Sequence, residues 1–378
     1  MKILLTLLLL TSFSPAQETK DQIPVQGKFP PAGVAKYFAG ELVAIDHVNR
    51  RGALRLDGDG SEDAYHSAPS HQFAILPYGT LTYHGALAEL RDIPIGTHLH
   101  GHFLLPPEGD TTIPAPSGEG GKYVPPYNHA LTLEDDFSYH QGNNRAWKIN
   151  AIDLAKGTLD LTLTPGDKKP EVPVTIDRST RIWKGRTIAT LEDLAPDQLV
   201  QINFTWAPDW RFGQFHAADI WIDDESRVIA SEAQRQLHIR YLTHRWLPGW
   251  IDHVEHQPGG KGIVTLTLFA GPYPSFFENG RVKPQSGHFA RLAASDNTLR
   301  TWWKDNDSTP GHIIETKDLP NPPPGSSGLQ IRIPLDQLLD GIRPGRIIRI
   351  QTVGLPMSRN PAEERIKSLI ELLNDRRK

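Results

Sequence analysis

The stretch GELVAIDHVNRRGALRL, residues 40–56, decides the fold, because it reads as two short alternating strands joined by a turn. Two later stretches repeat its order of features: AWKINAIDLAKGTLDLTL at 146–163 and GWIDHVEHQPGGKGIVTLTLF at 249–269. Each carries an Ile-Asp pair in its first strand and a glycine before its second strand. The chain therefore contains three related units. The pairs place Asp46, Asp153 and Asp252 at equivalent positions, and the glycines are Gly52, Gly157 and Gly262.

Each unit is completed by a third strand and a closing strand. The third strands lie in 71–85, 172–185 and 287–302, and the closing strands follow in 89–103, 190–204 and 338–353. A turn-prone residue precedes each closing strand, namely Gly96, Asp197 or Gly345. Four or five short strands bury one face and hide their edges best in a small closed barrel. We therefore predict a mainly β protein with three tandem small OB-like or SH3-like β-barrels, one inter-repeat helix and a C-terminal helix.

The segments between the units differ in composition. Residues 223–248 have helical periodicity, with Asp223 or Asp224 as the cap and a buried stripe of Ile229, Ala233, Leu237 and Tyr241. Residues 106–145 are rich in Pro, Gly and acidic residues, as is typical of a loop. The predicted boundaries are signal peptide 1–16, linker 17–36, barrel 37–105, loop 106–145, barrel 146–222, connecting helix 223–248, barrel 249–356 with insertions, and C-terminal helix 357–378.

The N-terminus and the composition together predict export. The first residues, MKILLTLLLLTSFSPAQ, have the basic start, short apolar run and small residues of a secretory signal peptide cleaved after Ala16. We predict no transmembrane anchor after cleavage. The chain has no Cys, which excludes disulfides and thiolate metal ligands. Its net charge of −4 argues against nucleic acid as a partner. We therefore expect a periplasmic or extracellular location, with an envelope protein or a polysaccharide as partner.

Three histidines alternate in IPIGTHLHGHFLLPPEG, residues 93–109. When the three closing strands are aligned, His98 matches Leu199 and Ile347, His100 matches Gln201 and Arg349, and His102 matches Asn203 and Gln351. This alternation favours the wet face of a barrel strand over a metal site. In the alternative, two of the histidines bind a divalent metal together with a third ligand, for which Glu108 and Asp110 are nearest in sequence.

Two further clusters are weaker candidates. WIDHVEH brings together Asp252, His253, Glu255 and His256, which could bind a metal, although a role in the repeated turn is favoured because His253 matches His47. WWKDNDS places Trp302 and Trp303 beside Asp305 and Asp307, a combination found in sugar and Ca²⁺ sites but more often in ordinary packing beside a polar turn.

On these repeated strand and turn positions, the chain resembles small OB-like repeat domains of unknown function in exported bacterial proteins. The resemblance implies an exported small-barrel fold and no catalytic residues. Motifs of hydrolases, phosphate-binding loops and dinucleotide-binding folds are not found in the sequence. We therefore expect a non-enzymatic binding or scaffold protein of the cell envelope without a cofactor. The alternative is a metal-binding protein or metal-dependent hydrolase that uses a His/Asp cluster.

Overall fold

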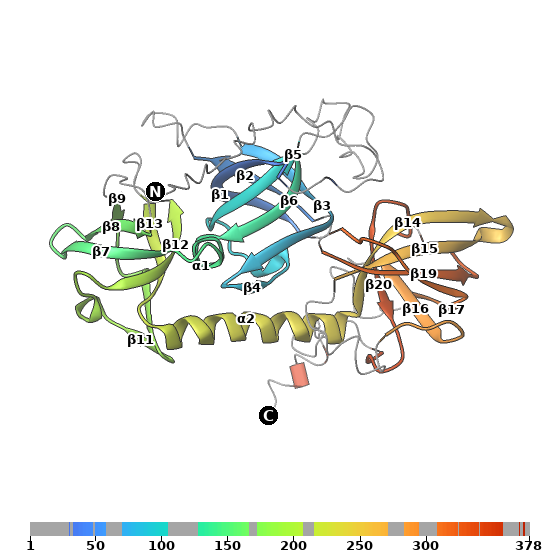
Figure 1. Ribbon diagram of the computed structural model, residues 1–378. Helices are drawn as coiled ribbons and strands as arrows, with labels where there is room; N and C mark the ends of the chain where they lie inside the picture. Colours follow the sequence, from blue (N-terminus) through green and yellow to red (C-terminus); the bar gives the residue numbers. More distant parts are fainter. Residues whose placement is uncertain are drawn as a thin grey trace, which may run out of the picture.

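The computed structural model describes residues 33–357, with gaps at 48–49, 58–69, 105–127, 166–171, 207–214, 271–282, 295–307, 324 and 340, and also residues 30, 370, 373 and 374. These residues form a mainly β protein of three closed small barrels in tandem, which confirms the predicted fold class (Figure 1). Each barrel has its own hydrophobic core.

Barrels 1 and 2 share one strand order. Barrel 1 contains β1 (Lys36–Asp46), β2 (Arg51–Leu56), β3 (Ser70–Tyr83), β5 (His98–Leu104) and β6 (Asn128–Asp135) in the closed order β1-β2-β3-β6-β5. The β3–β6 pair is parallel and the other pairs are antiparallel. Barrel 2 repeats the order with a parallel pairing to its last strand, and this arrangement is OB-like. Its strands are β7 (Ala146–Asp153), β8 (Thr158–Thr164), β9 (Val172–Thr175), β10 (Arg181–Lys184), β11 (Thr187–Ala189), β12 (Leu199–Trp206) and β13 (Phe215–Trp221).

Barrel 3 closes differently. The sequence predicted its third strand in 287–302, but the strand that pairs with β15 (Lys261–Phe269) is β19 (Ser326–Leu335). Instead, β16 (Phe289–Ala294) pairs with β20 (Ile347–Gln351) and with β17 (Ser308–His312). The prediction for this strand is therefore wrong, because an insertion supplies the strand beside β20. The first strand is β14 (Leu247–Gln257), and β18 (Glu315–Asp318) lies outside β19.

The repeat alignment of the closing strands is confirmed by hydrogen bonds. In each barrel, the turn residue donates its N–H to a core residue of the first strand: Gly96 to Leu42, Asp197 to Ile149 and Gly345 to Ile251. All three turn residues have positive φ, at 98°, 68° and 74°. This conformation explains why glycine or aspartate occupies the position. The residues two positions after these turn residues are His98, Leu199 and Ile347, so the three are equivalent, as the sequence predicted.

The alignment of the third hairpin needs a correction. A bulge follows Leu42, Ile149 and Ile251 in the three first strands, so these residues are equivalent. Asp46 and Asp153 lie four residues beyond, and in barrel 3 that position is Glu255. Asp252 is therefore not their counterpart, and His253 does not match His47. The prediction failed because the third hairpin is longer than the other two. Its Ile-Asp pair, Ile251-Asp252, therefore looks equivalent in the sequence to the pairs that end in Asp46 and Asp153, although it lies at a different position of the strand.

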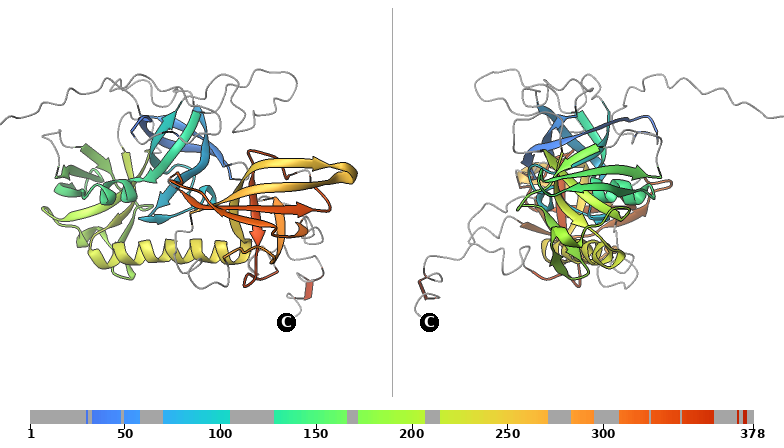
Figure 2. Two further views of the ribbon diagram at one scale, coloured as in Figure 1. Left: turned by 45° about the vertical axis from the view of Figure 1, so that its right-hand side comes forward. Right: turned by 90° about the vertical axis from the view of Figure 1, so that its left-hand side faces the viewer.

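The helix α2 (Asp224–Arg245) sets the order of the barrels in space. Asp223 caps it by accepting a hydrogen bond from the Ser226 N–H, as predicted. Its 22 residues span about 33 Å at 1.5 Å each. It contacts β10 and β13 of barrel 2, β4 (Ala86–Leu87) of barrel 1 and β14 of barrel 3. Barrel 1 therefore lies between barrels 2 and 3, with α2 running past it (Figures 1 and 2).

The buried face of α2 is polar along most of its length, which corrects the predicted stripe except at Tyr241. Ala233 is exposed and Ile229 and Leu237 are half-buried, whereas Gln234, His238 and, near the end of the helix, Tyr241 and Leu242 are buried. The Gln234 amide donates to the Leu87 carbonyl and to Asp92 in barrel 1. Periodicity failed here because α2 packs on exposed backbone and charges at the edge of a barrel rather than on an apolar surface.

Residues 106–145 do not form only a loop. Asn128–Asp135 is β6, the last strand of barrel 1, and Asp136–Gly142 is the short helix α1. A polar composition hid a strand whose residues Ala130 and Leu133 enter the core on either side of a register shift. The predicted signal peptide, the Trp302–Asp307 cluster and nearly all of the predicted C-terminal helix lie outside the described residues. Among the described helices, none is long and apolar enough to cross a membrane.

Candidate metal centre between barrels 1 and 2

The strand β5 directs two of the three histidines into the junction between barrels 1 and 2. His98 and His100 lie on one face of β5 because side chains alternate along a strand. They are only 4% and 6% exposed. The sequence predicted a wet face here, and this prediction is wrong because α1 and barrel 2 cover the face. The contacts include ring packing of His98 on Phe215 and of His100 on Tyr139.

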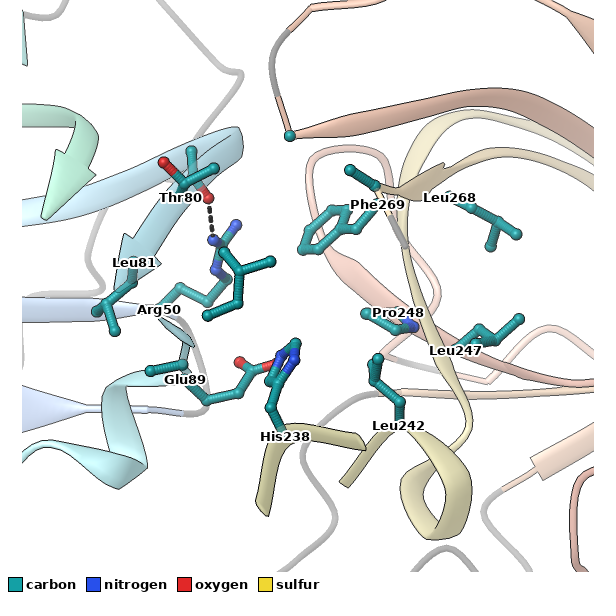
Figure 3. Close-up of a pocket in the computed structure, with 15 residues that line it drawn as sticks. Arg50, Thr80, Leu81, Glu89, His238, Leu242, Leu247, Pro248, Leu268 and Phe269 are labelled. Atoms are coloured by element: carbon teal, nitrogen blue, oxygen red, sulfur yellow. Dashed lines mark hydrogen bonds between the residues drawn. The ribbon is translucent and has the colours of Figure 1, made fainter. Parts of the chain in front are cut away.

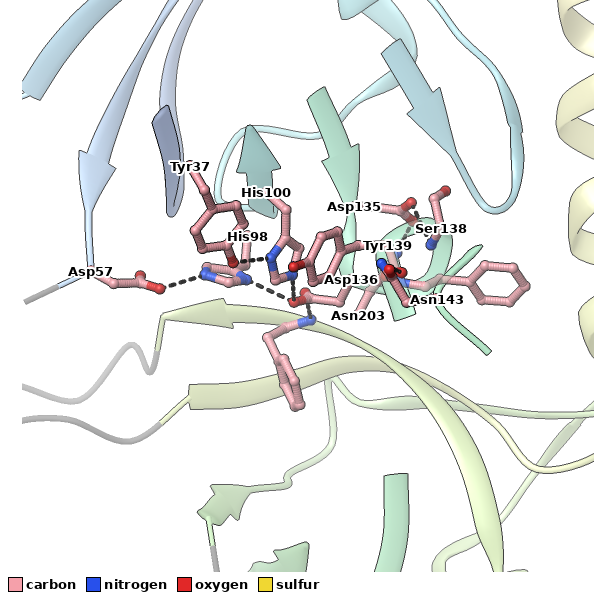
Figure 4. A network of polar contacts seen from close by, with 12 residues as sticks. Tyr37, Asp57, His98, His100, Asp135, Asp136, Ser138, Tyr139, Asn143 and Asn203 are labelled. Atoms are coloured by element: carbon pink, nitrogen blue, oxygen red, sulfur yellow. Dashed lines mark hydrogen bonds and ion pairs between the residues drawn. The ribbon is translucent and has the colours of Figure 1, made fainter. Parts of the chain in front are cut away.

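A carboxylate from α1 joins the two histidines. Asp136 is the first residue of the helix, capped by Asp135, and is 1% exposed. Its Oδ1 atom lies 2.7 Å from His98 Nδ1 and 2.9 Å from His100 Nε2 (Figure 4). One ligand atom from each of these three residues lies within 4.8 Å of the others. Two imidazoles and a carboxylate are donors that Zn²⁺ and other divalent transition metals accept.

The outer atoms of the three residues are also held. His98 Nε2 lies 2.9 Å from Asp57 Oδ2, and His100 Nδ1 lies 2.7 Å from the Tyr37 hydroxyl. The Oδ2 atom of Asp136 accepts the backbone N–H of Phe204, at 2.9 Å. Metal-binding histidines commonly have their second nitrogen fixed by a carboxylate or hydroxyl in this way. The inner nitrogen atoms of both histidines therefore meet at one atom, Asp136 Oδ1.

Protonation gives the same cluster a second chemical state. Burial alone would lower the pKa of His98, but Asp136 and Asp57 outweigh it and raise that pKa to about 10. Burial opposes the charge on Asp136, yet His98 and His100 hold its pKa well below the usual range. With no metal bound, His98 is thus a buried imidazolium between two carboxylates. A metal ion would replace the shared protons.

His140 stands beside this cluster. It follows Asp136 by four residues on α1, which places the two on one side of the helix. Its ring centroid is 5.4 Å from that of His100 and 5.3 Å from that of Trp147. Burial lowers the pKa of His140 to about 4, so it is neutral. Its Nδ1 atom is buried and has no hydrogen-bond partner among the described residues. This nitrogen, next to the centre, can therefore still accept or donate a hydrogen bond, depending on the tautomer.

The fit to a metal requires a small expansion. Zn–N and Zn–O bonds of about 2.1 Å at tetrahedral angles separate neighbouring donors by roughly 3.4 Å. The hydrogen-bonded N–O distances are 2.7 and 2.9 Å, so the donors need to move apart by about half an ångström. The donor set therefore fits a divalent metal with three protein ligands.

Polar contacts continue from this centre across the junction. Asn203 of β12 donates to Asp135 at 2.7 Å and accepts the Phe137 N–H at 2.8 Å. Asp135 also accepts from the backbone of His84 and Ser138. Phe137 packs edge-on against Trp221 of β13. The centre is thus part of a buried, well-bonded surface that joins the two barrels.

The other residues singled out in the sequence do not join the centre. His102 follows on the same strand but is not part of the three-residue group, and its Nδ1 atom lies 2.9 Å from the Thr132 hydroxyl. Asp252 accepts from Thr267 and Gln330, and Glu255 pairs with Arg332 at 2.8 Å. His253 and His256 are exposed on β14. Among the described residues, these four barrel 3 side chains do not form a three-ligand group. Glu108 and Asp110, the expected third ligands, lie outside the described part of the chain.

The sequence reasoning missed Asp136, Asp57 and Tyr37. Asp136 is 36 residues beyond His100, in the segment interpreted as a loop. Its local signal was the pair Asp135-Asp136 before a short polar helix, which is typical of helix capping. That pattern carries no information about a contact with β5.

Comparison with known proteins does not assign the chain to a family. No protein-family model, curated protein or solved structure matches this chain.

Proposed function

We propose that the protein is an exported, non-enzymatic binding protein of the cell envelope, in which a divalent metal, best matched by Zn²⁺, fixes barrel 1 to barrel 2. The observation that carries the proposal is the convergence of His98, His100 and Asp136 within 4.8 Å. The three residues come from a strand and a helix of barrel 1, and the Phe204 amide of barrel 2 holds the carboxylate. The metal would stabilise one relative position of the two barrels. An envelope protein or a polysaccharide is the proposed partner class.

A metal-dependent hydrolase is the second candidate. It is favoured by the number of protein ligands, since three leave a fourth position for water or substrate. Burial argues against it, because the three ligands are 1–6% exposed and lie under barrel 2. A catalytic metal needs access for substrate, whereas a structural metal does not. Zn²⁺-loaded protein that cleaves simple ester or phosphoester substrates, with loss of cleavage in His100→Gln, would reverse this preference.

The test is metal binding to the purified, chelator-treated protein by calorimetry, with elemental analysis of the metal content. We expect one Zn²⁺ per chain and a rise in melting temperature of several degrees that EDTA reverses. At free Zn²⁺ of 100 times Kd, the stabilisation is about 2.7 kcal/mol. Mn²⁺ and Mg²⁺ serve as harder competitors, and we expect them to bind more weakly to imidazole.

The strand β5 supplies a matched pair of variants. His100→Gln introduces the residue that barrel 2 carries at the equivalent position, Gln201, and we expect it to abolish binding. His102→Gln changes a histidine on the same strand outside the centre, and binding is expected to be unchanged. Absence of Zn²⁺ binding by the unmutated protein, or equal loss in the two variants, would refute the metal centre. The proton-linked network would then remain as a purely structural contact of a scaffold protein.

A further inference from the structure

A cavity lies on the opposite side of barrel 1, where barrel 1, barrel 3 and α2 meet (Figure 3). Its volume is about 70 Å³. At 10–15 Å³ for each water, this corresponds to about five waters or one very small organic molecule. The cavity is independent of the metal centre, because it shares no residue with it.

One side of the cavity is apolar. Phe269 from barrel 3 points into it (Figure 3), and its lining also includes Leu242 of α2 and Leu247, Pro248 and Leu268 of barrel 3. These side chains would contact an aliphatic chain rather than a polar one. Burial of such a chain is favourable by about 0.8 kcal/mol for each CH₂ group.

The other side carries buried charge. Arg50 donates to the carbonyl groups of Leu76 and Gly79, at 3.2 and 2.7 Å, and its guanidinium lies 4.9 Å from the Phe269 ring centroid. Burial lowers the pKa of Arg50 to about 10, so it is still cationic at neutral pH. Burial opposes ionisation of Glu89, yet Arg349, His238 and Arg50 lower its pKa, so it is anionic.

The nearby arginines outnumber this carboxylate. Glu89 Oε1 lies 3.5 Å from Arg349, while both described hydrogen bonds of Arg50 go to neutral carbonyls. Arg349 Nε is buried and lacks a hydrogen-bond partner among the described residues. Two buried guanidinium groups thus share one carboxylate, and a buried cation without a matching anion is costly. A second anion in the cavity would relieve this imbalance.

The backbone beside the cavity is held in an unusual conformation. Arg50 and Tyr78 have φ of 52° and 64°, in the left-handed region that non-glycine residues seldom adopt. Such residues persist where the surroundings fix them, and they concentrate at binding sites. At Gly325, across the junction, an added Cβ would lie 1.8 Å from the Tyr78 carbonyl oxygen. Barrel 3 therefore packs directly against the Tyr78 backbone, while the hydrogen bonds to Leu76 and Gly79 hold the Arg50 side chain at the cavity wall.

We propose that this cavity binds a small aliphatic carboxylate, with its anionic group at Arg50 and its chain against Leu242, Pro248 and Phe269. The volume restricts the ligand to a few carbon atoms. The carboxylate would neutralise the excess buried positive charge, and the chain would displace water from the apolar wall. Since three parts of the molecule form the cavity, occupancy would also fasten barrel 3 and α2 to barrel 1.

The test uses sodium butyrate as the probe, with the full chain in EDTA so that the metal centre does not contribute. We expect butyrate to raise the melting temperature and to give a saturable calorimetric signal. Sodium chloride at equal ionic strength, n-butanol and n-butylamine are the controls. Butanol has the chain without the charge, and butylamine has the opposite charge, so both are expected to bind at least ten-fold more weakly.

Variants separate binding at this site from a general effect. Arg50→Gln removes the cation, and Leu242→Phe fills the cavity from α2 without changing its charge. We expect each to weaken butyrate binding at least ten-fold, with folding checked by circular dichroism. Arg55→Gln is the control, because Arg55 pairs with Glu41 at 2.7 Å away from the cavity. The proposal is overturned if butyrate behaves like chloride or butanol, or if binding persists in Leu242→Phe.

Discussion

Barrel 1 contacts barrel 2 on one side and barrel 3 on the other, and the two junctions are built differently. At the barrel 1–2 junction, buried charged and amide groups meet at 2.7–2.9 Å around Asp136 and Asn203. At the barrel 1–3 junction, the cross-barrel polar contacts of Glu89 with Arg349 and of Tyr78 with Asp252 are both 3.5 Å long, and a cavity remains. Short, satisfied contacts favour one fixed arrangement, whereas long contacts around a cavity leave room for a ligand.

The difference arises at equivalent positions of the repeat. His100, Gln201 and Arg349 occupy the same place in β5, β12 and β20, and all three are buried. Each lies where its strand meets another part of the molecule. The polar face of the closing strand is therefore a docking face in every barrel. The identity of the residue then determines whether the contact is a metal-competent cluster, an amide contact or an ion pair.

The largest effect is expected for Asp136→Asn. It removes the charge that balances His98 and weakens the acceptor shared by His98 and His100. Breaking a buried ion pair costs about 3 kcal/mol or more. Urea denaturation in EDTA should show this loss. A change below about 1 kcal/mol, within the range of an exposed pair, would show that the barrel 1–2 junction is not the tighter of the two.

A smaller effect is expected for Glu89→Gln at the other junction. It leaves Arg50 and Arg349 without this counter-charge, but Glu89 is partly exposed and its ion pair with Arg349 is longer, so we expect a loss of about 2 kcal/mol. Butyrate should restore part of this loss, because it supplies a negative charge to the same region. A loss larger than that of Asp136→Asn would reverse the ranking of the junctions.

The pH dependence of stability provides a third comparison in metal-free protein. The His98 pKa rises from 6.5 to about 10 on folding, so its contribution is complete below pH 6.5 and is lost as pH rises through 10. The stability difference between the unmutated protein and Asp136→Asn should therefore narrow from pH 7 to pH 10. Melting curves over this range test the prediction, and a constant difference would contradict it.

His140 acts in the opposite direction on the acid side. Its pKa falls from 6.5 to about 4 on folding, because burial disfavours the imidazolium. Its contribution is complete above pH 6.5 and is lost as pH falls through 4. His140→Phe should therefore lessen the acid sensitivity between pH 6.5 and 4. The same acid sensitivity in the variant would assign the effect to other groups.

The smallest effect is expected for Tyr78→Phe. It removes one 3.5 Å hydrogen bond to Asp252 and retains the ring contact with Phe269. We expect a loss of about 0.5 kcal/mol, at the lower limit for a protein hydrogen bond. A loss above about 2 kcal/mol, measured by urea denaturation, would mean that the barrel 1–3 junction depends on this contact more than its length indicates.

The repeat could be predicted from the sequence because its signals are local. Strand alternation, and the turn residues Gly96, Asp197 and Gly345, depend only on neighbouring residues. The same reasoning failed for β16 and Asp252, since an insertion and a longer hairpin change which strands pair without changing the local pattern.

The candidate site was predictable only in part. His98 and His100 were found because they alternate on one strand. Their burial depends on α1 and barrel 2, which approach from distant parts of the chain. The sequence pattern therefore predicted a solvent-exposed strand face where the structure has a face that packs against barrel 2. Asp136 was missed for the same reason: its partnership is set by tertiary contact rather than by spacing.

The helix α2 has one further consequence. It begins at barrel 2, which is fixed on one side of barrel 1, and ends at barrel 3 on the other side. Barrel 3 is thus held at a high effective concentration near its docking surface, as in any tethered pair of binding modules. A junction of low intrinsic affinity then suffices to keep barrel 3 in place.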